Sequence, residues 1–236
     1  MPEHADLAIA PRFIRAVHIQ RDFRNLRYRL DGYQATPLVR QAAGRIIAGL
    51  TPGSSERAFS VVEPFGSGKS AFGLFVAHFL QRGEAARRQL LGSLRIAESA
   101  LLPIDAPSLL AVLVPGNNSS LRQAVLASLG AALAEPRLKT PALTQLRRTL
   151  EAAARDPALD PGRVAELVAE AAQLLQAHGH YQGVLVLIDE LGQFLDYAAR
   201  QDEERDLFVL QSLAETAARS GEAPVLVVTI LHQAFE

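Results

Sequence analysis

The sequence contains no cysteine, and this absence excludes several kinds of chemistry. Without a thiol there is no disulfide bond, no zinc–thiolate site and no cysteine nucleophile. The formal net charge is only −1, so the chain as a whole has no field that would attract nucleic acid. No apolar run approaches the ~20 residues that a membrane-spanning helix requires. Residues 1–11 have neither the basic start nor the apolar segment of a secretory signal. We therefore expect a cytoplasmic protein that does not enter a membrane.

The chain has 236 residues, of which 49% are hydrophobic, so it can bury a large core. This length fits one large α/β domain. Alternating apolar runs and helical patterns repeat four times, which predicts a parallel sheet covered by helices on both faces. Strands are expected at 58–62, 109–114, 184–188 and 225–229. Helices are expected at 37–50, 71–80, 84–102, 120–133, 142–154, 163–178, 191–199 and 207–219, with an exposed charged loop at 201–206.

The stretch from Ala58 to Leu80 has the layout of a phosphate-binding loop. An apolar run is followed by a tight turn over residues 63–68, by Lys-Ser, and by a pattern that predicts a helix. Backbone N–H groups of such a turn point inward and form a site for an anion. The positive end of the following helix adds to the same field. One position departs from the signature, because Glu63 stands where glycine is usual.

Each residue type in this turn has a physical reason. Glycine at Gly66 and Gly68 lets the backbone approach a phosphate or adopt a positive φ. Lys69 would reach the β- and γ-phosphates, and the Ser70 hydroxyl would ligate Mg²⁺. Lysine is scarce, with two in the chain beside 22 arginines, yet one stands here. The alternative interpretation is a glycine-rich turn with an incidental lysine. The candidate nucleotide-binding residues are Glu63, Pro64, Phe65, Gly66, Ser67, Gly68, Lys69, Ser70 and Ala71.

A second motif follows the predicted strand at 184–188, which ends in Asp189 and Glu190. Asp189 would hold Mg²⁺ through water beside Ser70, and Glu190 would polarise an attacking water molecule. A strand end can carry both roles because successive side chains diverge. The alternative is a strand that merely ends at two acidic residues.

The N-terminal part offers weaker hypotheses. Residues 12–22 are consistent with a short edge strand or an ordered arm. Arginines at 21, 24, 27 and 29 alternate with Phe23 and Tyr28, which suggests a contact surface for nucleic acid or for a neighbouring subunit's phosphates. The alternative is a solvated arm whose aromatic side chains pack on the domain. Tyr33 is a candidate adenine contact, with core packing equally favoured. His178 and His180 could ligate a metal, but a helix C-terminal cap suits them better.

From about residue 31 to its end, the chain resembles P-loop ATPases of the class with an additional strand between the Walker A and Walker B strands and a catalytic glutamate. This class includes the AAA+ and STAND ATPases. Glu63 departs from the Walker A pattern, as it does in some bacterial members. The residues that match Walker A are Gly66, Gly68, Lys69 and Ser70, and those that match Walker B are Asp189 and Glu190.

The resemblance implies a P-loop NTPase fold, a three-layer α/β sandwich with a mainly parallel sheet, over residues 31–236, preceded by an arm at 1–30. It places the strand at 225–229 between the other two motif strands. It also implies a polar sensor of the γ-phosphate near the end of that strand, where Thr229 fits and His232 and Gln233 are rivals. No helix covers this strand in the sequence, which predicts a domain that continues past residue 236.

More narrowly, the runs 63–70, 187–195 and 231–236 are similar to large bacterial ATP-binding proteins with an N-terminal nucleotide domain, some linked to phage defence. We expect an ATPase that binds ATP with Mg²⁺ and uses Glu190, Lys69 and Thr229 in hydrolysis. Its cycle would drive a conformational change in a longer chain or a homo-oligomer. The alternative is a nucleotide-gated switch or scaffold with little turnover. ATP is favoured over GTP because no Asn-Lys-x-Asp guanine reader is present, and DNA association is a further hypothesis.

Overall fold

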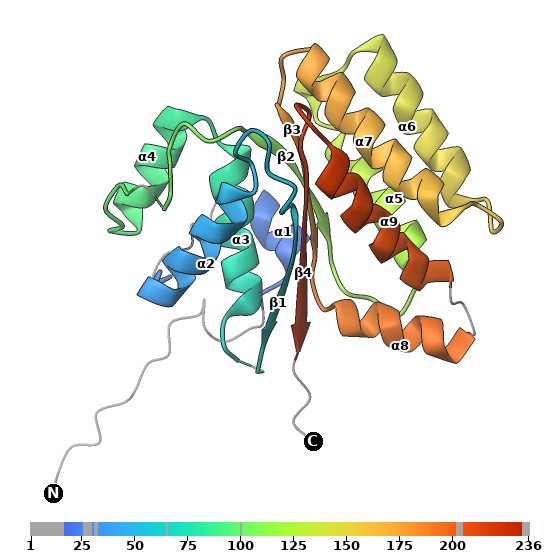
Figure 1. Cartoon of the computed structure of the whole chain (residues 1–236). Coiled ribbons are helices and arrows are strands. Elements are labelled where there is room, and N and C mark those ends of the chain that lie inside the picture. Colours follow the sequence, from blue (N-terminus) through green and yellow to red (C-terminus); the bar gives the residue numbers. More distant parts are fainter. Residues whose placement is uncertain are drawn as a thin grey trace, which may run out of the picture.

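The computed structural model describes residues 17–25, 30, 33–64, 66–99, 101–201 and 205–232. A four-stranded sheet lies between two groups of helices, α1 to α4 on one side and α5 to α9 on the other (Figure 1). The strands are β1 (Ala58–Glu63), β2 (Leu109–Val114), β3 (Gly183–Ile188) and β4 (Val225–His232). The helices are α1 (Ile19–Arg24), α2 (Pro37–Ala48), α3 (Lys69–Gln81), α4 (Glu84–Ser93), α5 (Leu121–Ala132), α6 (Pro141–Ala154), α7 (Pro161–Ala177), α8 (Leu191–Gln201) and α9 (Arg205–Arg219), with a 3₁₀ turn η2 (Pro136–Leu138).

All strand pairs of the sheet are parallel, and the strand order is β1-β4-β3-β2. The predicted α/β class and parallel sheet are therefore confirmed. β4 lies between β1 and β3, as the resemblance implied, and it continues to His232 rather than ending at Thr229. Because parallel strands share one direction, the carboxyl ends of β1, β4 and β3 meet at one edge of the sheet.

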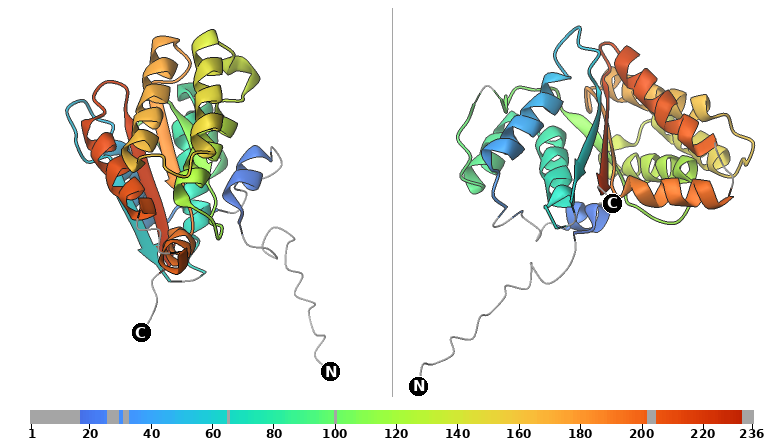
Figure 2. Two further views of the ribbon diagram at one scale, coloured as in Figure 1. Left: turned by 90° about the vertical axis from the view of Figure 1, so that its right-hand side faces the viewer. Right: turned by 60° about the horizontal axis from the view of Figure 1, so that its bottom comes forward.

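Successive residues of the central strands contribute to two separate cores, one on each face. On β4, Val225 and Val227 belong to the core beneath α5, α7 and α9, whereas Leu226 and Val228 belong to the core beneath α3. β2 and β3 are buried along their whole length. Continuous apolar runs are the expected sequence of strands with both faces covered. Figure 2 shows the two helical layers from further sides.

Local sequence signals explain several helix starts. Thr36 accepts a hydrogen bond from the backbone N–H of Val39 at 3.3 Å, and Pro37 occupies the first helical position of α2. Thr140 does the same for α6 with Leu143, at 3.2 Å. Such caps satisfy backbone donors that have no partner inside the helix.

The helix predicted at 84–102 is wrong in its extent, because α4 ends at Ser93. The N–H of Ile96 donates to the carbonyl of Leu91 at 2.9 Å, and that of Arg95 donates to Gly92 at 3.1 Å. This pair of bonds is the Schellman arrangement that terminates helices. Its left-handed position is occupied by Arg95, with φ 55°, where glycine is usual. The sequence therefore gave no glycine signal at the actual end.

The exposed loop expected at 201–206 is also wrong at both ends, because Gln201 is the last residue of α8 and Arg205 is the first residue of α9. Asp206 lies in the first turn of α9 and is only 3% exposed. Its carboxylate accepts hydrogen bonds from the Ser120 hydroxyl at 2.9 Å and from the N–H of Leu121 at 2.7 Å. Asp206 thus caps the N-terminus of α5 from a distant part of the chain.

Side-chain amides form hydrogen bonds with backbone groups at the free edge of β2. Gln20 of α1 donates to the carbonyl of Leu113 at 2.7 Å, and Gln81 of α3 accepts from the N–H of Ala111 at 2.9 Å. Residues 12–22 were expected to form an edge strand or an ordered arm. Their described part, residues 17–22, contains no strand, and the short helix α1 begins at Ile19. Within the described residues, no helix combines the length and apolar character needed to cross a bilayer.

Candidate functional site

The predicted phosphate loop connects the end of β1 with the start of α3. Gly66 and Gly68 have φ values of 77° and 86°, in the left-handed region that favours glycine. A Cβ added to either would meet none of the described atoms within 4 Å, so backbone conformation rather than space explains these glycines. The backbone of 66–68 is exposed, and no described side chain caps α3. The first N–H groups of this helix are therefore available to an anion.

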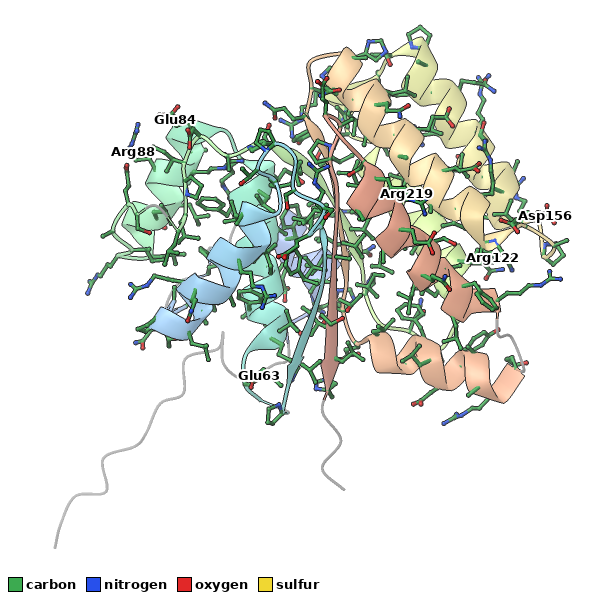
Figure 3. All side chains as sticks on the ribbon, viewed as in Figure 1. Glu63, Glu84, Arg88, Arg122, Asp156 and Arg219 are labelled. Atoms are coloured by element: carbon green, nitrogen blue, oxygen red, sulfur yellow. The ribbon has the colours of Figure 1, made fainter. Side chains whose placement is uncertain are left out.

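Lys69 places a positive charge inside this loop. Its side chain is only 6% exposed, and Nζ donates to the carbonyl oxygens of Glu63 at 2.6 Å and Pro64 at 2.5 Å. Glu63 itself is exposed at the end of β1, beside the loop (Figure 3). Ser67 is exposed and Ala71 is half-buried, while Phe65 lies outside the described residues. The ammonium group of Lys69 is thus held by backbone carbonyls of the predicted phosphate loop.

The structure brings Ser70 and Asp189 close together. The Ser70 side chain lies near enough to the Asp189 carboxylate to lower its pKa by hydrogen bonding, although the two residues are far apart in the sequence. Asp189 is 5% exposed, and its N–H donates to the carbonyl of Val114 at 2.9 Å, which fixes it at the end of β3. Burial raises the pKa of Asp189, and the hydrogen bond with Ser70 opposes that rise. The predicted phosphate loop and the predicted acidic pair therefore share one site.

Glu190 follows Asp189 with a left-handed backbone, at φ 50°. Its N–H donates to Oδ1 of Asp189 at 3.0 Å, and its carbonyl accepts from the N–H of Gln193 at 2.9 Å. The Gln193 side-chain amide also donates to Oε2 of Glu190. A non-glycine residue in this conformation costs about 1–3 kcal/mol and persists only where its surroundings fix it. Here the hydrogen bonds with Asp189 and Gln193 fix it.

The two sensor candidates on β4 lie on opposite faces of the sheet. Thr229 continues the series of Val225 and Val227, and its hydroxyl pairs with that of Ser60 at 2.9 Å. The structure therefore does not bring Thr229 to the α3 face, where Ser70 and Asp189 meet. His232 is on that face by the alternation of the strand, and it lies near enough to Asp189 to lower the pKa of that carboxyl. Gln233 lies outside the described residues.

Tyr33 packs on the α3 side of the sheet. Its ring lies 5.6 Å from that of Phe75, centroid to centroid, two turns into α3 from the loop. Burial raises the pKa of its hydroxyl, which has no hydrogen-bond partner among the described residues. Tyr33 therefore packs against the core, as one of the two interpretations expected, and its contact with adenine stays a prediction.

Metal binding at this site would need oxygen atoms from a ligand. Among the described residues, no group of three or more His, Asp or Glu side chains could hold an ion. Ser70 and Asp189 supply two hard oxygen donors, and Mg²⁺ commonly combines one or two protein oxygens with water and phosphate. The rings of His178 and His180 lie 6.5 Å apart at the C-terminal end of α7, consistent with a helix cap.

The N-terminal arginines give little further support to a contact surface. Arg21 is exposed and pairs with Asp22 at 3.3 Å, while the ring of Phe23 stacks on His78 at 4.4 Å. Phe23 thus fits the interpretation in which the aromatics pack on the domain. Tyr28, Arg27 and Arg29 lie outside the described residues.

Sequence reasoning missed two residues that surround Glu190. Gln193 stands three positions after Glu190, which is the spacing of a helix capping box and could have been noticed. Gly116 follows β2, and a Cβ added to it would lie 2.5 Å from the Cβ of Glu190. Only the neighbouring positions of β2 and β3 reveal that contact.

Comparison with models of known protein families, with curated proteins and with solved structures gave no match for this chain.

Proposed function

We propose that this chain binds ATP with Mg²⁺ and hydrolyses it, so that the nucleotide cycle changes the conformation of a longer chain or an oligomer. The observation that carries the proposal is the proximity of Ser70 to Asp189, which is close enough for the serine side chain to lower the pKa of the carboxylate. It joins the glycine loop to the acidic strand end, which are the two parts that a magnesium-nucleotide site requires.

The loop has the properties of a triphosphate cradle. The exposed backbone at Gly66 and Gly68 leads into the uncapped N-terminus of a 13-residue helix. Lys69 adds a charge that is already desolvated and hydrogen-bonded to the loop. On binding, the ammonium would exchange carbonyl partners for phosphate oxygens, which are stronger acceptors for a cation.

Ser70 and Asp189 would hold the magnesium ion, directly or through water, and Mg²⁺ when bound would neutralise charge on the phosphates. Glu190 would accept a proton from, or orient, the water that attacks the γ-phosphate. His232, rather than Thr229, would contact the γ-phosphate from the end of β4, because it lies on the same face as Asp189. We also propose three more specific assignments: membership of the AAA+ or STAND class, a role in phage defence and an association with DNA.

Nucleotide binding is tested first. A fluorescent ATP analogue is titrated against the wild-type chain with and without Mg²⁺, and against Lys69→Ala. The control is Lys139→Ala, which removes the chain's other lysine from an exposed position. We expect Lys69→Ala to weaken binding at least about tenfold, since a charge-assisted contact contributes about 1.5–3 kcal/mol. Equal affinities for the two variants would contradict the proposal.

Hydrolysis is tested separately by phosphate release. Glu190→Gln should bind the analogue normally and lose turnover by about 10²-fold or more, because it removes the proton acceptor and keeps the shape. Undiminished turnover in this variant would refute the catalytic assignment. Tight binding by the wild-type chain with negligible turnover would favour the nucleotide-gated switch instead.

A further inference from the structure

The Glu190 carboxylate is enclosed on one side by two residues that have no role in the proposed nucleotide contacts. Gln193 of α8 donates its side-chain amide to Oε2 of Glu190. Gly116, in the segment after β2, lies so close that an added Cβ would be 3.0 Å from the same oxygen and 2.5 Å from the Cβ of Glu190. Both observations concern Oε2, so Oε1 is the carboxylate oxygen that neither Gln193 nor Gly116 occupies.

The backbone of Glu190 makes this arrangement directional. Its φ of 50° lies in the left-handed region, so the side chain of Glu190 does not follow the alternation of side chains along β3. The N–H of Gln193 bonds the carbonyl of Glu190 at 2.9 Å, so backbone and side chain of Gln193 both hold the same residue. An amide is neutral, and it therefore orients a carboxylate without pairing it with a positive charge.

We propose that Gln193 is the positioning residue for Glu190, and that it acts by holding Oε2 against Gly116 so that Oε1 faces the reacting water. This inference rests on the proposed ATP hydrolysis and adds the device that orients its base. A displacement of about 1 Å in a catalytic group can reduce the rate by about 10²-fold. Loss of either contact should therefore act on the chemical step rather than on nucleotide affinity.

A purely structural role for Gln193 leads to a different expectation. If Gln193 only stabilised the start of α8, its replacement would lower the free energy of unfolding and leave turnover per folded molecule unchanged. The rate constant kcat, the KM for ATP, the affinity for a fluorescent ATP analogue and the melting temperature together separate the two roles.

The decisive variants are Gln193→Met and Gly116→Ala in the full chain. Gln193→Met keeps the length of the side chain and removes the donor, whereas Gly116→Ala keeps the donor and displaces Glu190 sterically. The matched control is Gln211→Met, because the exposed Gln211 of α9 also donates to a carboxylate, that of Glu215 at 3.0 Å. We expect the first two variants to lower kcat about 10- to 100-fold with analogue affinity within about twofold of wild type, and the control to change neither.

The outcomes distinguish failure of the positioning role from failure of the proposed hydrolysis. If the wild type hydrolyses ATP and Gln193→Met changes kcat by less than about twofold, the positioning role alone is overturned. A loss of kcat matched by an equal loss of analogue binding would also overturn it, because the effect would then lie in the loop. If the wild-type chain binds the nucleotide but does not hydrolyse it, the proposed hydrolysis is overturned, and the positioning role with it.

Discussion

The side-chain oxygens of Thr229 and Ser60 lie 2.9 Å apart, between β4 and β1. This pair is on the face of the sheet opposite to Asp189, and the Thr229 hydroxyl also approaches the carbonyl of Phe59 at 3.4 Å. Thr229 is 6% exposed, so its hydroxyl needs these partners to offset its burial. The geometry gives Thr229 a structural role and, under the proposed function, leaves the contact with nucleotide to His232.

Replacement of Thr229 tests this assignment. Thr229→Val keeps the branched shape and removes the hydroxyl, so the free energy of unfolding should fall by about 1 kcal/mol while kcat for ATP stays within about twofold. In a double-mutant cycle, Ser60→Ala should cost less in the Thr229→Val background than in the wild type. A variant of normal stability that has lost turnover would return the sensor role to Thr229.

Asp206 supplies a second prediction, through its cap on α5. Asp206→Ala would leave the Ser120 hydroxyl and the N–H of Leu121 without their acceptor in a buried setting. We expect the free energy of unfolding, measured by urea denaturation, to fall by about 2–3 kcal/mol. Asp196→Ala, on an exposed position of α8, should change it by less than about 0.5 kcal/mol. Equal effects of the two variants would show that the cap contributes little.

Arg87 and Arg88 are adjacent arginines with opposite environments, and they form a matched pair of variants. Arg87 is 1% exposed, and burial lowers its pKa to about 10. Arg88 is exposed and pairs with Glu84 on the surface (Figure 3). It also pairs with Glu98. The Arg87 guanidinium donates to the carbonyl oxygens of Phe79, Leu80, Ile104, Ala106 and Pro107.

Arg87→Met should therefore destabilise the chain by about 3 kcal/mol or more, since buried carbonyls at the end of α3 and before β2 lose their donor. Arg87→Lys should not restore stability, because one ammonium cannot reproduce the planar set of donors. Arg88→Met should leave the stability close to that of the wild type, because exposed ion pairs contribute little. Thermal and urea unfolding provide the comparison, and a tolerated Arg87→Met would contradict this account of the buried guanidinium.

His78 gives the folded state a specific dependence on pH. Burial lowers its pKa to about 4, and the nearby charge of Arg82 acts in the same direction. In the unfolded chain the pKa returns to about 6.5. Between pH 6.5 and pH 4 the unfolded state therefore binds more protons, and the free energy of unfolding falls as the pH falls, by up to about 3 kcal/mol. His78→Phe preserves a ring against Phe23 and should remove this component. Identical pH profiles of unfolding for the two proteins would contradict the assignment.

Much of the fold could be predicted because its signals are local. The buried strands are continuous apolar runs, and α2 begins at a Thr-Pro pair that caps and pre-organises its first turn. Gly66 and Gly68 have the positive φ that the loop motif led us to expect. The same kind of reasoning did not locate the end of α4, because the left-handed position there is occupied by Arg95 and not by glycine.

The amino-acid sequence by itself determined the sheet class, the glycine loop before α3 and the acidic residues at a strand end, because each depends on neighbours within a few positions. Only the tertiary structure decided that Asp189 meets Ser70, that Gln193 and Gly116 enclose Glu190, and that Thr229 faces away from them. The physical reason is that β4 is covered on both faces. Its apolar residues form one continuous run, so the sequence has no polar alternation to show which face a residue lies on until β1 and β3 pair on either side.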